Sequence, residues 1–312
     1  MTIPTISLRS TNLAQEVYEA CTTSGFFYLE DHDIDAEKLG AWRASQELFL
    51  DETKEAIMQK NDSIDREGHT GYTALMHEKL DPSSPIKVGD LKESFYISPN
   101  ALFGKKQRLP GIIQQYQEGL ERLDADCIRV CLVLLQAFAQ ALKLDPDHFA
   151  SKHHAEDDRL RLIHYPPASV AEGESGSIRA GSHSDYGSLT LLFQKTVSGL
   201  QVQTGTDMWA DVPPKPGCLV VNVGDAMEFW SAGLFRSTQH RVVMPRNEAE
   251  AVSRFSIAYF CHPDSQALLE PLTKAGSAAD DWKAVLQRKG IHALEPMTGG
   301  QHLSSRLRST GL

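Results

Sequence analysis

The chain has 312 residues and a formal net charge of −10 at pH 7, so it is long enough for one large folded unit with a sizeable core. The acidic balance, with no stripe of Lys and Arg, argues against nucleic acid or an anionic membrane as a partner. No apolar run of about 20 residues and no signal-peptide start are visible, so we expect a soluble cytoplasmic protein.

The first part of the chain, residues 1–150, is predicted to be rich in helix around one early strand. Apolar residues near the start recur at helical spacing, and the run 26–29 is typical of a strand. Residues 120–144 are predicted to form a long amphipathic helix, which Pro146 ends. A helix of this kind more often supports a sheet than touches a ligand. We therefore expect an α-rich region that packs on a core formed by residues 151–312, in one structural unit.

From about residue 160 onward, short strands alternate with Gly, Pro and Asn. The stretch 219–225 is typical of a buried strand that ends in a turn, and a further apolar run begins at His240. Many short strands with such turn signals favour two sheets packed face to face. We therefore predict a mainly β fold with flanking α-helices and a jelly-roll core, also called a double-stranded β-helix.

Two imidazoles and one carboxylate are spaced to hold one face of a metal: His183, Asp185 and His240. If residues 182–193 form a strand or its edge, His183 and Asp185 point to the same side, and a return strand delivers His240. Such a set leaves coordination positions free, as in non-haem Fe(II) oxygenases, whereas a structural zinc site closes all four positions. The spacing predicts a catalytic metal centre.

The same pattern of His, one residue and an acid occurs twice more, at His154 with Glu156 and at His262 with Asp264. Neither pair is followed by a His at the start of an apolar strand, and Pro263 weakens a regular strand at the second pair. We expect these residues to form surface pairs.

The run 254–260 alternates, so that Arg254 and Ser256 share one face of a strand with Ala258 and Phe260. A guanidinium cannot lose its charge, and at the end of a buried strand it needs a carboxylate from the protein or from a ligand. The ligand interpretation fits 2-oxoglutarate, whose distal carboxylate would meet this Arg and Ser. The alternative is an Arg that pairs with an Asp of the core.

These residues carry a family resemblance. The chain resembles the isopenicillin N synthase-like branch of the Fe(II)- and 2-oxoglutarate-dependent dioxygenases, and the match runs almost from end to end. The tail also resembles the closing C-terminal helix of that family. The matching segments are 3–6, 13–21, 25–29, 90–95, 162–167, 183–194, 216–225, 237–245, 254–264 and 298–310.

The resemblance implies that His183, Asp185 and His240 bind Fe(II). It also implies that Arg254 and Ser256 bind the distal carboxylate of 2-oxoglutarate, and that Tyr165 holds the co-substrate near the metal. One departure is Ile163, where many plant-type members have Asn. The alternative for Tyr165 is a strand-end ring that fills the core. The implied reaction uses O2 to turn 2-oxoglutarate into succinate and oxidises, most often by hydroxylation, a small organic molecule. Ascorbate is expected to support the activity.

Two further interpretations stay open. One is an Fe(II) oxidase of the same fold that does not use 2-oxoglutarate, in which Arg254 and Ser256 bind a carboxylate of the substrate. The other is a catalytically silent binding protein. The region 68–99 walls the substrate side in relatives, but the sequence does not identify the substrate, the bond that is oxidised, or the oligomeric state.

Overall fold

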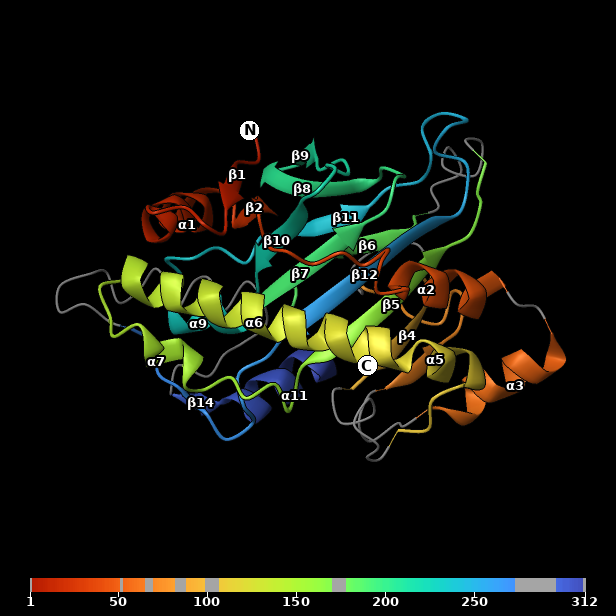
Figure 1. Cartoon of the computed structure of the whole chain (residues 1–312). Coiled ribbons are helices and arrows are strands. Elements are labelled where there is room, and N and C mark those ends of the chain that lie inside the picture. The colour runs from red at the N-terminus through yellow and green to blue at the C-terminus, as the bar shows by residue number, and fades with distance from the viewer. Residues whose placement is uncertain are drawn as a thin grey trace.

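The main sheet has eight strands, and every neighbouring pair in it is antiparallel except β1 and β2 (Figure 1). The computed structural model describes residues 2–50, 53–64, 70–81, 88–98, 107–169, 178–272 and 296–310. In spatial order the strands are β1 (Thr5–Ser7), β2 (Phe26–Glu30), β10 (Leu219–Val223), β7 (Leu189–Gln194), β12 (Arg254–Cys261), β5 (Arg159–Tyr165), β4 (Glu93–Ile97) and β3 (Gly71–Thr73).

A second, four-stranded sheet packs on one face of the main sheet. Its strands, in spatial order, are β6 (Ala180–His183), β11 (His240–Val242), β8 (Leu200–Gly205) and β9 (Met208–Asp211). Buried apolar side chains from both sheets meet between them, for example Val220 with Leu200 and Ala258 with Val242. The short strands β13 (Leu268–Leu269) and β14 (Met297–Thr298) pair separately. Two sheets packed in this way confirm the predicted jelly-roll core.

Helices cover the other face of the main sheet. The longest, α6 (Gln117–Ala141), crosses it, and its apolar stripe joins the largest hydrophobic cluster (Figure 1). The predicted helix over 120–144 is therefore confirmed, but it ends earlier, before Lys143 takes a positive φ of 60°. The other helices are α1 (Leu13–Thr23), α2 (Ala41–Leu50), α3 (Lys54–Asp62), α5 (Gly111–Gln115), α7 (Asp147–Ala150), α9 (Asp225–Trp230) and α11 (Gly299–Thr310).

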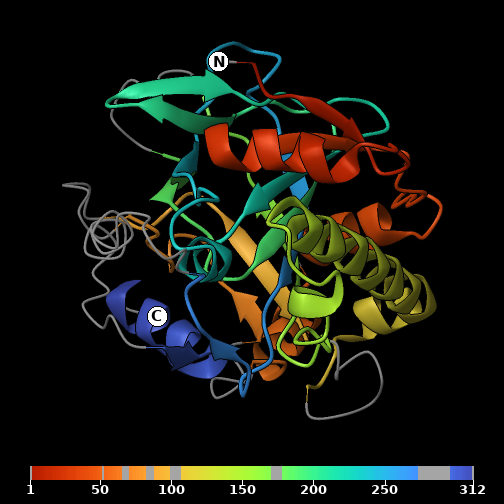
Figure 2. The same cartoon turned by 90° about the vertical axis from the view of Figure 1, so that its left-hand side faces the viewer.

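The expectation of one early strand is wrong. Four strands of the main sheet, β1 to β4, come from the first 150 residues. The strands β1 and β3 have three residues each, too few for an alternating pattern to stand out from the sequence. In the view of Figure 2 the C-terminal helix α11 lies at one end of the molecule and α1 lies toward the other. Within the described ranges, no helix has both the length and the apolar character needed to cross a membrane.

The buried face of α6 carries one acidic residue, Asp124, which is 1% exposed. Neither of its carboxylate oxygens has a hydrogen-bond partner among the described residues, and burial raises its pKa to about 7. Because the folded state prefers the protonated carboxyl, this group costs stability progressively as the pH rises from about 4, the ordinary pKa of Asp, to about 7. Above that pH the full cost is present.

We expect Asp124→Asn to raise the free energy of unfolding at pH 8 by roughly 2 kcal/mol, because the neutral amide carries no charge to desolvate. The gain should shrink at pH 5. Chemical denaturation at pH 8 and at pH 5 measures the free energy of unfolding of the variant and of the wild type. The control is Asp126→Asn on the same helix, where the carboxylate already pairs with Arg122 at 3.1 Å near the surface. An equal gain at both pH values would contradict the assignment.

Candidate metal centre

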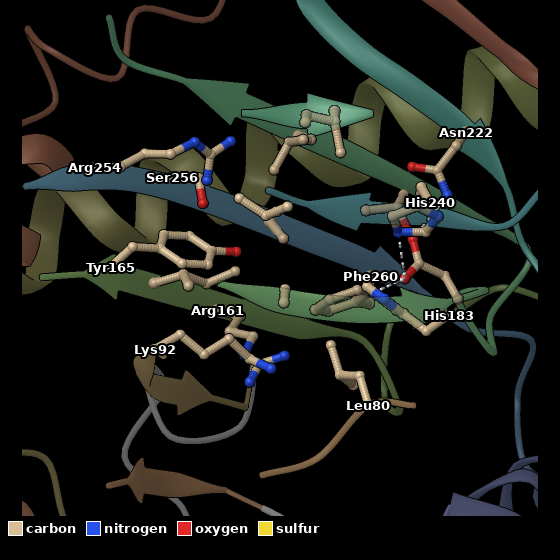
Figure 3. A pocket seen from close by; sticks show the side chains of 18 of the residues that line it. Leu80, Lys92, Arg161, Tyr165, His183, Asn222, His240, Arg254, Ser256 and Phe260 are labelled. Carbon is tan, nitrogen blue, oxygen red and sulfur yellow. Dashed lines mark hydrogen bonds and ion pairs between the residues drawn. The ribbon is translucent and has the colours of Figure 1, made fainter. Parts of the chain in front are cut away.

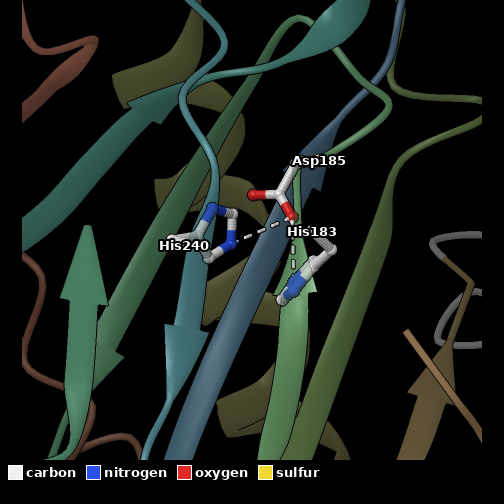
Figure 4. Close-up of side chains that lie close together, drawn as sticks. All are labelled: His183, Asp185 and His240. Atoms are coloured by element: carbon white, nitrogen blue, oxygen red, sulfur yellow. Dashed lines mark ion pairs between the residues drawn. The ribbon is translucent and has the colours of Figure 1, made fainter. Parts of the chain in front are cut away.

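His183, Asp185 and His240 meet at one end of the space between the two sheets (Figure 4). His183 ends β6 and His240 begins β11, and the two residues are direct partners in the register of these strands. Their Nε2 atoms lie 3.9 Å and 3.6 Å from Oδ1 of Asp185. One nitrogen or oxygen from each residue lies within 4.8 Å of the other two. The three predicted ligands therefore converge on one point.

Asp185 reaches this point from a bend and not from a strand. Residues 182–193 are not one continuous strand, because β6 ends at His183 and β7 begins only at Leu189, so Asp185 lies just beyond the edge of β6. The backbone carbonyl of Asp185 accepts a hydrogen bond of 2.7 Å from the amide of Asp225, the first residue of α9. A Cβ at Gly187 in the same bend would lie 2.4 Å from the carbonyl oxygen of Cys261. Tight backbone packing thus sets the direction of the carboxylate.

Backbone carbonyls orient both imidazoles. Nδ1 of His183 donates to the carbonyl of Gly181 at 2.8 Å, and Nδ1 of His240 donates to the carbonyl of Thr238 at 3.2 Å. A carbonyl only accepts, so in the neutral form of each ring the proton sits on Nδ1 and Nε2 presents its lone pair toward the other two residues. Burial also lowers the pKa of His183 to about 3, which keeps this ring neutral at pH 7.

Two polar side chains hold the carboxylate of Asp185. Thr190 Oγ1 and Asn222 Nδ2 both donate to its Oδ2, at 2.6 Å and 2.7 Å, which leaves Oδ1 directed at the imidazoles. Burial alone would raise the pKa of Asp185, but the two histidines and these hydrogen bonds together lower it. Neither donor was predicted from the sequence, because only the pairing of β10 with β7 shows that Asn222 stands opposite Thr190.

The C-terminal helix contacts the bend that carries Asp185. Arg306 of α11 forms a buried ion pair of 2.9 Å with Asp225, and its guanidinium lies 5.3 Å from the centre of the Tyr186 ring. His302 Nε2 lies 3.2 Å from the carbonyl oxygen of Tyr186. The helix expected from the family resemblance is thus present, and it packs directly behind the bend that carries Asp185.

The other two His and acid patterns contribute no residue to the candidate metal centre or to the pocket beside it. His154 and Asp264, one residue from each pattern, pair with each other through a 2.6 Å contact between Nδ1 and Oδ2, and the His154 side chain is 69% exposed. His262 is buried, and its backbone amide donates to Asp158. The expectation of surface pairs within each motif is wrong for His262, which is buried, and the exposed His154 instead pairs with Asp264 of the other motif.

A pocket between the sheets extends from the metal centre to Arg254 (Figure 3). The predicted face of β12 lines it with Arg254, Ser256, Ala258 and Phe260. The other lining residues are Phe26, Leu80, Lys92, Arg161, Ile163, Tyr165, Ala180, His183, Asp185, Thr190, Leu192, Leu200, Asn222, His240 and Val242.

Arg254 is 1% exposed, and its Nη2 donates to Oε1 of Gln194 at 3.1 Å. Its Nε has no hydrogen-bond partner within the described part of the chain. Burial lowers the pKa of Arg254, and no acidic side chain is among the groups that act against this. Within the described part of the chain, Arg254 therefore does not pair with an Asp of the core.

Tyr165 and Ser256 lie beside this guanidinium. Tyr165 is the register partner of Arg254 on β5, its ring centre lies 4.8 Å from the guanidinium carbon, and it is 4% exposed. Ser256 follows two residues after Arg254 on the same face and is 1% exposed. The pocket thus has the candidate metal centre at one end and a buried cation with a hydroxyl at the other.

The side chains of His183, Asp185 and His240 form a donor set that suits a catalytic metal ion. Two imidazoles and one carboxylate are ligands that Fe(II) accepts, and three protein ligands leave positions open for a co-substrate. Thiolates, which mark most structural zinc sites, are absent from the described residues around the centre. The residues present fit a catalytic Fe(II) ion.

Comparison with known proteins agrees with this geometry. Residues 156–263 match the 2OG-Fe(II) oxygenase superfamily, and residues 3–114 match the family described as non-haem dioxygenase in morphine synthesis N-terminal. The UPF0676 protein C1494.01 of Schizosaccharomyces pombe is 31% identical, with 99% of this chain and 92% of that protein covered. The proline hydroxylase buaE of Petromyces alliaceus is also 31% identical, with 97% of this chain and 94% of that protein covered.

Among solved structures, a full-length Neurospora crassa protein in complex with alpha-KG superposes with a TM-score of 0.82 at 28% identity, over 99% of this chain and 96% of that one. The chain therefore belongs to the 2OG-Fe(II) oxygenase superfamily. Within this superfamily it is a non-haem dioxygenase that uses Fe(II) and 2-oxoglutarate and converts 2-oxoglutarate to succinate as it oxidises its substrate.

Proposed function

We propose that the His183, Asp185 and His240 side chains hold the Fe(II) ion of this dioxygenase. Arg254 and Ser256 take the distal carboxylate of 2-oxoglutarate. The observation that supports this assignment best is the buried guanidinium of Arg254, which lines the same pocket as the three ligands and has no carboxylate partner among the described residues. A ligand carboxylate would supply the missing negative charge.

Fe(II), with 2-oxoglutarate and O2, supplies the oxidising chemistry, and the protein supplies position and shielding. Gln194 and the Tyr165 ring hold the guanidinium of Arg254 in one place. Tyr165 is proposed to lie against the bound co-substrate. Apolar side chains between the two ends, such as Leu192 and Val242, exclude water from the space where the co-substrate chain would lie.

The oxidation is proposed to be the hydroxylation of a small organic molecule. Support comes from relatives: one is named as a proline hydroxylase, and the Neurospora crassa protein was also solved in complex with alpha-KG and thymine. The pocket is enclosed by buried strands of both sheets, which suits a small substrate better than a macromolecule. Proline and thymine differ in chemistry, so neither name carries over to this chain.

The test uses purified protein with Fe(II), ascorbate and 2-oxoglutarate in air, and it measures succinate and O2 uptake with and without candidate substrates. We expect succinate to form, with a rate that a true substrate stimulates. Uptake of O2 that does not depend on 2-oxoglutarate would instead indicate an oxidase of the same fold. Low metal content, with unchanged behaviour of His183→Ala, would indicate a silent binding protein.

The hydrogen bonds to Asp185 give a separate prediction. Thr190→Val and Asn222→Leu should each weaken Fe(II) binding by roughly 10- to 100-fold, the usual effect of removing a group that orients a metal ligand. Anaerobic calorimetric titration with Fe(II) measures the affinity. Asn247→Leu, at an exposed position outside the pocket, is the matched control. Wild-type affinity in both variants would show that the carboxylate needs no such support.

A further inference from the structure

A second pair of cations lines the pocket, on a side that the proposed co-substrate does not need. Lys92, just before β4, and Arg161 of β5 are 3% and 5% exposed, yet both contribute to the pocket wall. Figure 3 shows them together on the side of Leu80, opposite Asn222 and apart from Arg254. Nothing in the binding of iron or of the distal carboxylate accounts for them.

Two carboxylates hold these cations from behind. Lys92 Nζ lies 2.9 Å from Glu78 Oε2 and 2.6 Å from Asp90 Oδ2, and Arg161 Nη2 pairs with the same Glu78 oxygen. Glu78 and Asp90 are buried but do not line the pocket. Burial alone would raise the pKa of Glu78, but Arg161 and Lys92 lower it far below its usual range. Two basic side chains thus meet two carboxylates, and their formal charges cancel.

Arg161 in this wall has a hydrogen-bond donor without a partner among the described residues. Arg161 uses Nη2 for Glu78 and for Ser94 Oγ at 2.9 Å, while its Nε has no partner within the described ranges. The guanidinium lies 4.4 Å from the centre of the Tyr96 ring, which fixes its plane. A buried ion cluster of this kind costs desolvation energy and is weak evidence for stability, so a role in recognition explains its position better.

Apolar side chains continue the wall from the cations toward the metal centre. Leu80, Ile163, Ala258 and Phe260 line this part of the pocket. The Phe260 ring centre lies 6.4 Å from that of Tyr96, so the aromatic contact with Arg161 extends toward Phe260. This wall therefore combines N–H donors at one end with an apolar surface beside them.

We infer that this wall, formed by Lys92, Arg161, Leu80 and Phe260, is the substrate subsite, and that the substrate presents a carbonyl or carboxylate oxygen on a small apolar body. The inference rests on the proposed function, because it takes the iron to lie at the three ligands. An acceptor oxygen would satisfy the free donor of Arg161, whereas an ammonium group would face two cations. A neutral carbonyl adds no charge to a cluster that is already balanced.

The test is anaerobic calorimetry on the enzyme loaded with Fe(II) and 2-oxoglutarate, with three probes that share one ring: benzamide, benzoate and benzylamine. We expect benzamide and benzoate to bind, and benzylamine to bind at least about 10-fold more weakly. Arg161→Gln should weaken benzamide binding by roughly 10-fold or more, as expected for a lost charged donor. Lys92→Gln tests the same wall if the first variant does not fold.

Glu78→Gln is the matched control, because it makes the same kind of change in a residue behind the wall. It leaves both cations in place and removes one negative charge, so benzoate should bind more tightly and benzamide should be little affected. Equal binding of benzylamine and benzamide, binding of no probe, or wild-type benzamide affinity in both Arg161→Gln and Lys92→Gln would overturn the inference.

A titration with 2-oxoglutarate alone distinguishes a wrong substrate subsite from a wrong co-substrate site. If 2-oxoglutarate binds to the wild type and to the variants, the pocket is folded and the co-substrate site is correct, so a negative probe result concerns the substrate wall only. If the Fe(II)-loaded wild type does not bind 2-oxoglutarate, the proposed co-substrate site is itself wrong.

Discussion

Asp185→Ala is expected to abolish tight Fe(II) binding and, with it, the formation of succinate. The carboxylate is the one anionic member of the ligand set, and its Oδ1 lies within 4 Å of both Nε2 atoms. Its loss leaves two neutral imidazoles for a divalent ion. The affinity should fall by more than about 100-fold, beyond the range for the loss of an orienting group alone. Metal analysis after reconstitution and desalting measures the iron that remains.

The matched control is Asp264→Ala. Asp264 also contacts a His, at 2.6 Å, but the His154 side chain is 69% exposed and neither residue lines the pocket. Iron content should stay at the wild-type level in this variant. If Asp185→Ala retained full iron content, the ligand assignment would be refuted, whatever the activity of the variant.

The three residues that converge in the candidate metal centre were recognisable from the sequence because their chemistry restricts the choice. A His and an acid one residue apart are common, but a later His at the start of an apolar strand distinguished His183 from the two similar motifs. The alternation of β12 also placed Arg254 and Ser256 on one face, as the pocket shows. These inferences used residue types and short-range periodicity, which a single sequence carries.

The supporting groups were not recognisable, because they depend on which strands pair. Thr190 and Asn222 are neighbours only through the register of β7 and β10. The same holds for Arg161 and Ser94, which meet through the pairing of β5 with β4 while Glu78 comes from a preceding segment. No local pattern marks such contacts.

Part of the fold also depended on long-range pairing. The strand predicted at 219–225 exists as β10, but the turn expected after it is the start of α9, whose first amide holds the bend of Asp185. The strands β3 and β4 extend the main sheet beyond β5. Their positions follow from cross-strand partners and not from composition.

Arg254→Lys is expected to raise the KM for 2-oxoglutarate by roughly 10- to 100-fold, as for the loss of one hydrogen bond between charged groups. An ammonium is a point charge on a flexible stem and cannot make the two parallel contacts that a guanidinium makes with a carboxylate. It would also lose the stacking on Tyr165 that fixes the cation in the pocket. Initial rates of succinate formation over a range of 2-oxoglutarate concentrations give the KM.

Arg241→Lys is the control for this substitution. Arg241 also stacks on an aromatic ring, that of Trp209 at 4.1 Å, and bonds a glutamine, Gln201, but it does not line the pocket. Its replacement should leave the KM unchanged. An unaltered KM in Arg254→Lys would place the distal carboxylate elsewhere. The buried guanidinium would then bind a carboxylate of the substrate itself. In that case Arg254→Met, loaded with iron, would bind 2-oxoglutarate alone as tightly as the wild type does.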